Sequence, residues 1–489
     1  MKNLFKYAHH LGFNNPYFLK NKQKLIFDTK FESIISKTAS TYTLNPKALL
    51  SFFNKFYFLA DNSIVNEINR SPWMGMPNKD KTDWNFYDLP KHQNKIKKEE
   101  NVANGLFELL CEEIVEYVGE AKSVGILLSG GMDSRMVAGC LHHLMHQKRI
   151  DLKRVVAYTW GNTDSRDYIY AKRLAHDLDW EFKSYQIGAE EMWNNFMISG
   201  LRGCEYSGLH LHAMPQIAET NDVEVMLAGS YGDSIGRAEY SEIKVDKVSA
   251  ISQKINNRAG LLNPKVFKKS KALLLEDINK YHTIFKKEKA YEENEIDLQL
   301  HYMRRMLNPC MEVINDITPL FQIFTSPKVF AYMWSLDVSV RNDKVYYCML
   351  KKFPDEISKV PWARTGKRFM HDEDIPDQHK KKHHNYFDIV QFELYDKILS
   401  YVDANKAYLS YVNIDAFKMI MKEVKRFPKH NNDYLQLVSW IVSYTKFVKT
   451  YRDGLEAPKL FSSKYLALKT KYEYRLLTKA RQLKRAISK

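Results

Sequence analysis

The chain has 489 residues, 45% of them hydrophobic and 13% aromatic, which predicts a folded globular protein with room for two or three domains. Its formal net charge of +16 favours contact with an anion, for which ATP, an acidic substrate and nucleic acid are the candidates. The first residues lack a secretory apolar core, and no run of about 18 apolar residues occurs, so we expect a cytoplasmic protein without membrane insertion. The five cysteines lack the spacing of a disulfide framework or a zinc site.

The first hundred residues carry three local signals. Tyr17-Phe18-Leu19 and residues 25–28 flank a polar turn, which is typical of a β-hairpin. Asn45 followed by Pro46 predicts the capped start of a helix. A charged stretch at residues 91–100 then predicts a linker to the rest of the chain.

The most informative stretch is Ser123 to Arg135. It begins with a short apolar run that has the length of a buried strand, and apolar residues at helical spacing follow it. Between them, Ser129-Gly130-Gly131 allows a tight turn with inward N–H groups at a helix N-terminus, which suits a phosphate or pyrophosphate. Asp133 follows, where a carboxylate can hold Mg²⁺ against that anion. No Walker sequence, Gly-x-x-x-x-Gly-Lys-Ser/Thr, occurs here.

Strand and helix patterns alternate after this turn. We predict strands at residues 155–160, 181–187 and 223–228 and helices at 164–179 and 213–219. Such alternation predicts a parallel sheet with helices on both faces, in which ligands bind beyond the carboxyl ends of the strands. A second glycine-containing loop, with Asp233, should therefore share one rim with the first.

The chain is mostly helical in pattern from about Ile251. Ser326-Pro327 predicts a helix start, and the loop at residues 353–367 is rich in cations. Residues 464–489 predict a basic amphipathic helix that docks through Leu476, Ala480, Leu483 and Ile487. We interpret its charge, and that of Lys380-Lys381-Lys382, as a solvated face, with a binding role as the alternative.

Residues 127–134 resemble the Ser-Gly-Gly-x-Asp-Ser loop of ATP pyrophosphatases, which cleave ATP between the α and β phosphates. With residues 158–161 and 229–234, roughly residues 16 to 370 resemble the asparagine synthetase family and its relatives, including β-lactam synthetases. The resemblance implies an α/β fold of the PP-loop, HUP-like type. It further implies a degenerate remnant of a glutaminase-like domain at residues 1–98, a synthetase domain at 99–370 and a helical basic C-terminal extension at 371–489 that packs on it.

The resemblance also implies the roles of particular residues. Asp133 and Asp233 match the Mg²⁺-binding pair, and Lys367 is our candidate for the cation that stabilises the transition state, with Lys359 and Arg364 as rivals. The residues implied to bind ATP are Leu128, Ser129, Gly130, Gly131, Asp133, Ser134, Trp160 and Gly229.

Two departures from the family pattern matter. Position 2 is Lys2, where glutamine-dependent members carry a nucleophilic cysteine, so we predict no glutamine hydrolysis; nitrogen would come from ammonia, a separate glutaminase or an amine. Asn315 stands at the usual glutamate position, which leaves Glu312 and Asp316 as candidates for the acid/base role. His210 and His212, on one side of an extended segment, are further candidate bases or structural histidines.

We therefore expect an ATP-dependent, AMP-forming carbon–nitrogen ligase that adenylates a small-molecule or glycan carboxylate and transfers it to ammonia or an amine. The missing glutaminase favours polysaccharide or natural-product biosynthesis. One alternative is a catalytically silent nucleotide-binding partner subunit, motivated by Asn315 and by Ser234 at a usually acidic position. The other is an RNA-modifying pyrophosphatase; paired functional cysteines are lacking, so nucleic acid is not favoured as a partner.

Overall fold

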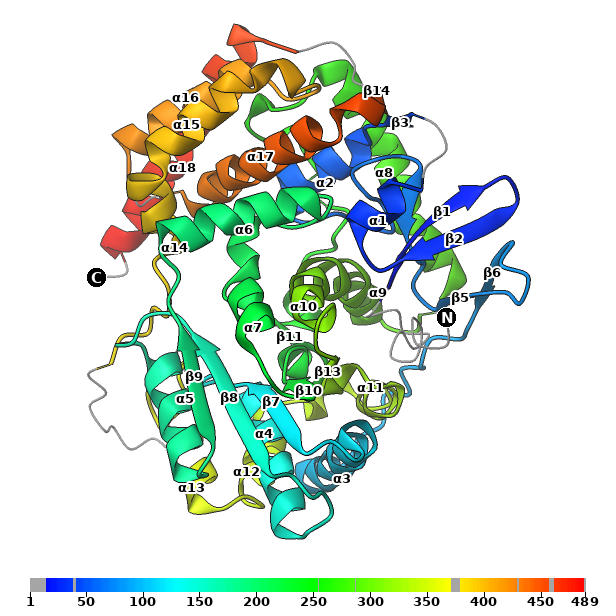
Figure 1. Cartoon of the computed structure of the whole chain (residues 1–489), viewed down its shortest axis with the longest axis vertical. Helices are drawn as coiled ribbons and strands as arrows, with labels where there is room; N and C mark the ends of the chain where they lie inside the picture. Colours follow the sequence, from blue (N-terminus) through cyan, green and yellow to red (C-terminus); the bar gives the residue numbers. More distant parts are fainter. Residues whose placement is uncertain are drawn as a thin grey trace.

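A five-stranded sheet lies at the centre of the fold. The computed structural model describes residues 15–37, 41–253, 255–285, 287–370, 379–428, 431–456 and 461–487 (Figure 1). The strand order is β13-β10-β7-β8-β9, and every neighbouring pair is parallel. The strands are β7 (Ser123–Leu127), β8 (Arg154–Trp160), β9 (Glu181–Tyr185), β10 (Val225–Ala228) and β13 (Leu320–Gln322). Four of them were predicted, whereas β13 was not.

Helices cover both faces of this sheet. Alternate residues such as Val124 and Ile126 belong to one core, and Leu127 and Tyr158 belong to a second core on the opposite face. The first core is completed by α3 (Glu99–Val118), α4 (Met132–His146), α5 (Arg166–Asp177) and α12 (Asp343–Leu350). The second is completed by α7 (Met214–Thr220) and α10 (Asn308–Asn315). The predicted α/β class with a doubly covered parallel sheet is confirmed.

The N-terminal residues and the C-terminal helices share a further hydrophobic core. Phe52 stacks on Trp440 with ring centroids 4.3 Å apart. The N-terminal elements are β1 (Tyr17–Asn21), β2 (Lys24–Asp28) and β4 (Ile68–Arg70), which form an antiparallel sheet, with α1 (Phe31–Ile35) and α2 (Pro46–Lys55). As predicted, residues 17–28 form a hairpin, and the Asn45 side chain caps α2. The boundaries at residues 98 and 370 stay a prediction, and Lys2 lies outside the described residues.

The C-terminal part is helical, as expected, and occupies the upper part of Figure 1. Its main helices are α15 (Tyr395–Ala404), α16 (Ile414–Arg426), α17 (Asn432–Thr450) and α18 (Lys464–Ile487). The remaining helices are α6 (Ala189–Leu201), α8 (Pro264–Ile284), α9 (Ala290–Asp297), α11 (Pro327–Trp334), α13 (Asp355–Ser358) and α14 (Tyr386–Asp388). Short strands lie at Tyr42–Thr43, Gly75–Pro77, Trp84–Phe86, Glu239–Tyr240, Ile243–Lys244 and Leu455–Glu456. Across the described ranges, no helix has the length and apolar character to cross a bilayer.

The predicted docking face of the last helix is wrong. Leu476 and Leu483 are 68% and 63% exposed, and Ala480 is exposed as well. The docked face instead carries Ala467, Thr470, Tyr474 and Thr478, which are all buried. The Thr470 hydroxyl donates to the Ala259 carbonyl, and the Tyr474 hydroxyl donates to the Phe427 carbonyl over 3.2 Å. The helix has two stripes of side chains that could pack, and local periodicity does not indicate which of them packs on the rest of the chain. The side chain of Ile487 lies outside the described part.

Candidate active site

The first glycine loop joins β7 to α4, and a buried arginine side chain holds it in place through hydrogen bonds to backbone carbonyls. The Arg135 guanidinium donates to the carbonyls of Val360 (2.5 Å), Pro361 (2.8 Å) and Gly130 (3.2 Å). A Cβ on Gly130 would lie only 2.9 Å from the Cβ of Ala363, so this residue must be glycine for the two loops to meet. Arg135 thus ties the loop to residues 360–363, a role that the sequence analysis missed.

The second glycine loop follows β10 and packs directly on Asp133. A Cβ on Gly229 would lie 2.6 Å from the Ser134 nitrogen and 2.7 Å from the Asp133 carbonyl carbon. A Cβ on Gly232 would lie 2.6 Å from the Asp133 Cβ. Both contacts are closer than a real side chain allows. The two loops, about a hundred residues apart in the chain, therefore meet around one carboxylate as the rim argument predicted.

We expect Gly229→Ala to disrupt this contact, because the added methyl group would push β10 and the first turn of α4 apart. ATP binding should weaken by about tenfold or more, since backbone displacement at a nucleotide loop is costly. Isothermal titration calorimetry with Mg-ATP measures it. Gly119→Ala is the matched control for an added methyl group, because nothing lies within 4 Å of a Cβ at Gly119. Its left-handed φ of 54° makes it a control for affinity but not for stability. Unchanged affinity in Gly229→Ala would contradict the tight contact.

The two aspartates lie in a partly buried, charged setting. The Arg237 side chain is 2% exposed, and its Nη2 lies 3.4 Å from Asp133 Oδ1, while its Nη1 lies 3.1 Å from Asp343 Oδ1. Burial raises the pKa of both aspartates, and for Asp233 the neighbouring charge of Asp133 adds to the rise, to about 7. Two neighbouring carboxylates that repel each other are stabilised by a cation that binds beside them. The role of Arg237 was not predicted from the sequence.

The donor set suits Mg²⁺ with ATP. Mg²⁺ typically takes one or two protein carboxylates and fills its remaining positions with phosphate oxygens and water. Asp133 and Asp233 supply such a pair, and the described ranges contain no cluster of three or more His, Cys, Asp or Glu residues placed to bind a metal. The two aspartates therefore suit the predicted Mg²⁺, which would take its other ligands from phosphate and water. They do not suit a metal that is held by protein side chains alone.

A cavity of about 320 Å³ opens beside these loops. Seven of the eight residues predicted to bind ATP line it, namely Leu128, Ser129, Gly131, Asp133, Ser134, Trp160 and Gly229. Gly130 packs behind the loop. Asp167, Met311 and His383 also line the cavity, although the sequence analysis gave them no role, and so does His212. Their signal was weak, because they come from three distant segments that only the fold brings together.

The predicted catalytic carboxylates are not among the residues that line the cavity. Glu312 makes a double ion pair with Arg70, with distances of 3.0 and 2.9 Å, and Asp316 lies 2.6 Å from Arg202. Asn315 Oδ1 accepts a hydrogen bond from the Leu320 nitrogen. These placements give each of the three residues a partner outside the cavity lining, and the acid/base role of Glu312 and Asp316 stays a prediction.

The candidate cations also differ in placement. Lys359 pairs with Asp355 at 2.5 Å on an exposed surface, and Lys367 does not line the cavity. Arg364 lies 3.4 Å from Glu239. Its charge lowers the pKa of Asp133 and so opposes the rise in that pKa which burial causes. Of the three predicted candidates, Arg364 is therefore the one that acts electrostatically on the aspartate pair. The catalytic role of Lys367 stays a prediction.

One wall of the cavity is built from aromatic and histidine rings. His212 stacks on Trp160 with centroids 5.4 Å apart, and its Nδ1 lies 3.1 Å from the Tyr386 hydroxyl. His384 stacks on Tyr386 at 3.9 Å. The expected extended segment at His210 is wrong, because residues 208–211 form a 3-10 helix that begins at the Ser207 cap. The turn places His212, but not His210, against the cavity.

These rings predict a loss of stability in mild acid. Burial lowers the pKa of His210 to about 4 and of His384 to about 3, and it lowers the pKa of His212 as well. The folded state therefore binds fewer protons than the unfolded state once the pH falls below the usual histidine value of about 6.5. The stabilising contribution is complete above that pH and is lost as the pH falls. We expect His384→Phe, which keeps the stacked ring, to make the urea midpoint fall less steeply from neutral to acid pH. An identical slope in both proteins would contradict this.

The sheet, the two glycine loops and the cavity at their rim define an α/β protein with a PP-loop, HUP-like fold. Residues 109–388, more than half of the chain, match the family model described as asparagine synthase. The protein belongs to this family. It is also 26% identical over 168 residues to a protein of Methanocaldococcus jannaschii named putative asparagine synthetase (glutamine-hydrolyzing) 1. That match covers 32% of this chain and 29% of the relative.

Proposed function

We propose that the protein is an ATP-dependent, AMP-forming amide ligase that activates a carboxylate and passes it to ammonia or an amine. Membership in the asparagine synthase family supports ATP-dependent ligase chemistry in general. The observation that carries the proposal is the meeting of the two glycine loops around Asp133 at the edge of a cavity. That arrangement presents backbone N–H groups, hydroxyls and the partly buried carboxylate of Asp133 to one ligand, with Asp233 close to Asp133 but outside the cavity lining, which suits a nucleoside triphosphate with Mg²⁺.

In the proposed reaction, an oxygen of the substrate carboxylate bonds to the α-phosphorus of ATP, and the bond to pyrophosphate breaks. The nitrogen of ammonia or an amine then bonds to the acyl carbon, and AMP leaves. The Ser129–Ser134 loop would hold the phosphates through its N–H and hydroxyl groups. Mg²⁺ held by Asp133 and Asp233 would supply neutralising charge on the pyrophosphate. Arg237 and Arg364 lower the pKa of Asp133, and Arg237 lowers that of Asp233, which partly offsets the rise that burial causes.

The amine must lose a proton, and His212 is the group on the cavity wall placed to take it. Its Nδ1 is engaged by the Tyr386 hydroxyl, which leaves Nε2 as the nitrogen available to a ligand. Burial keeps the pKa of His212 below its usual value, so the ring is neutral and has a lone pair for a proton, but it is a weaker base than an ordinary histidine. This role would replace that of the glutamate which the family resemblance places at Asn315.

The test is pyrophosphate release from Mg-ATP in the presence of ammonia or simple amines and a panel of amino acids, uronic acids and other carboxylates. We expect release that depends on one class of carboxylate, together with AMP in equal amount. ADP and inorganic phosphate as products would contradict the proposal. Binding of ATP without turnover across the panel would favour the silent-partner alternative, which the contacts of Asn315 and Glu312 keep open.

A further inference from the structure

The last helix, α18, exposes a row of large apolar side chains to solvent. Tyr465, Tyr472, Leu476 and Leu483 are 78%, 63%, 68% and 63% exposed, and Leu468 between them is 49% exposed. At about 100° per residue, the first four lie within about 40° of one another on the side of the helix opposite Tyr474. Tyr474 is 1% exposed and belongs to the docked face. We call these five residues the α18 stripe.

Cations surround the α18 stripe. The helix carries eight Lys and Arg residues against the single Glu473, and Lys464, Lys469, Lys479 and Lys484 are exposed. The wider region shares this bias. Residues 379–489 hold 23 Lys and Arg against 10 Asp and Glu, a net charge of +13 out of the +16 of the whole chain. The charge that the sequence shows is therefore concentrated in the C-terminal quarter of the chain, which includes α18.

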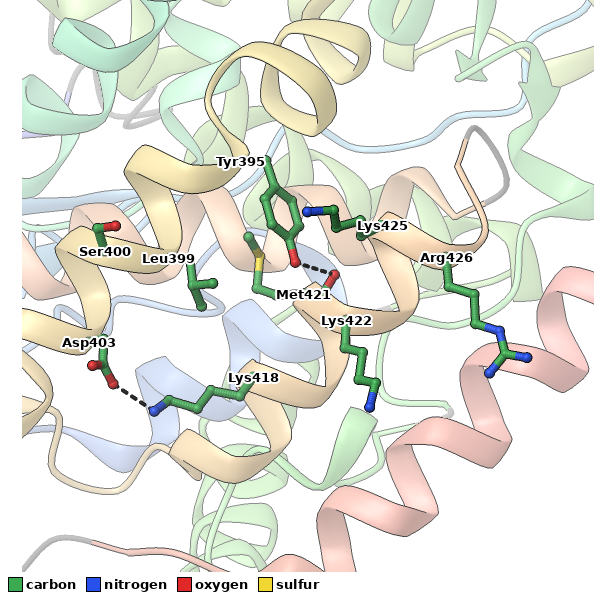
Figure 2. Close-up of a pocket in the computed structure, with 9 residues that line it drawn as sticks. All are labelled: Tyr395, Leu399, Ser400, Asp403, Lys418, Met421, Lys422, Lys425 and Arg426. Carbon is green, nitrogen blue, oxygen red and sulfur yellow. Dashed lines mark hydrogen bonds and ion pairs between the residues drawn. The ribbon is translucent and has the colours of Figure 1, made fainter.

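A basic groove lies next to α18. It is formed by α15 and α16, has a volume of about 580 Å³ and is lined by Lys418, Lys422, Lys425 and Arg426 (Figure 2). Within the described part of the chain, Lys422, Lys425 and Arg426 make no ion pair. Their helix, α16, contacts α18 through the Glu423 pair with Arg475 at 2.8 Å. The helix next to α18 therefore carries a second group of exposed cations.

The exposed apolar stripe and the cations around it together indicate what kind of partner would bind to α18. A second copy of α18 would bring eight cations against eight, which repel. Nucleic acid would satisfy the cations but would leave the leucines of the stripe exposed to water. An anionic bilayer surface satisfies both, because Tyr and Leu side chains enter the boundary between headgroups and acyl chains while Lys and Arg meet the phosphates.

We propose that α18 is an interfacial helix through which the protein binds the surface of an anionic phospholipid membrane. The stripe enters the headgroup region, and the cations of α18 and of the α15–α16 groove contact lipid phosphates. The helix lies on the membrane and does not cross it, consistent with the absence of a spanning helix in the described ranges. The inference is independent of the reaction proposed above.

The test is flotation of the full-length protein with vesicles of phosphatidylcholine alone or mixed with phosphatidylglycerol, without ATP. We expect binding to the anionic vesicles only. Tyr472→Ser combined with Leu476→Ser should weaken it by about tenfold or more. Lys469→Gln combined with Lys479→Gln should weaken it by about fivefold per charge removed. The matched control is Ile96→Ser with Ile317→Ser. These residues, at 78% and 63% exposed, are about as exposed as Tyr472 and Leu476 but lie outside α18.

Three results would overturn the proposal. The first is the absence of binding to anionic vesicles, and the second is equal binding by the serine variant. The third is a serine variant that instead changes the molar mass measured by light scattering, because the stripe would then be a contact between protein chains. The thermal unfolding midpoint of the serine variant should match that of the wild type, since the changed residues are exposed.

Discussion

Asp133→Asn is expected to lower pyrophosphate release by about 10²–10³-fold, because it removes one of the two negative charges that would hold Mg²⁺ against the phosphates. Asparagine has the same shape, so the contacts of Gly229 and Gly232 with residue 133 should persist. The fold should survive as well, since the change replaces a buried carboxylate with a neutral group in a site where burial already disfavours charge. Initial rates of pyrophosphate release at saturating Mg-ATP measure the effect.

The control for Asp133→Asn is Asp343→Asn. Asp343 is the other aspartate beside Arg237, at 3.1 Å, but it does not line the cavity. We expect its activity to stay within about threefold of the wild type, because the ion pair is partly exposed. Equal losses in the two variants would show that the effect comes from disturbing Arg237 and not from a direct role of Asp133 in holding Mg²⁺.

Arg70→Met should lower the free energy of unfolding by about 3–5 kcal/mol, because it leaves buried Glu312 without its ion-pair partner and buried Glu205 with Arg305 alone. The Arg70 side chain is 2% exposed and contacts Glu205 and Glu312 at 3.1 and 2.9 Å. Burial alone would lower the pKa of Arg70, yet the two glutamates hold that pKa well above its usual value. This arginine joins β4 to α10 across the N-terminal sheet.

Urea or thermal unfolding midpoints test this expectation against Arg154→Met. Arg154 also forms a two-fold ion pair, with Glu181 at 2.5 and 2.7 Å, but both side chains are partly exposed. We expect a loss of about 1 kcal/mol or less there. If Arg70→Met yields no folded protein, Glu312→Gln provides a milder change that keeps the hydrogen-bonding shape. A Glu312→Gln protein that is fully stable but inactive would instead support the predicted acid/base role of Glu312.

The sequence by itself determined the parts of the site that depend on neighbouring residues. A strand, two glycines and a helix start follow one another within residues 123–135, so local chemistry fixes the turn, the position of Asp133 and the anion-binding character. The same holds for the Asn45 cap and for the alternation that gives the parallel sheet. Seven of eight predicted ATP-binding residues line one cavity because five of them belong to one local motif at residues 128–134, while Trp160 ends β8 and Gly229 follows β10 at the same edge of the sheet.

Only the tertiary structure decided what depends on distant partners. The strand β13 has three residues, too few for a periodic signal, and exists because β10 offers it a hydrogen-bonding edge. Glu312 and Arg237 are ordinary charged residues in the sequence; packing turned the first into a partner of Arg70 and placed the second against Asp133. The two faces of α18 are equally packable in the sequence, and the choice between them was made by α16 and residues 258–260, which contact only one.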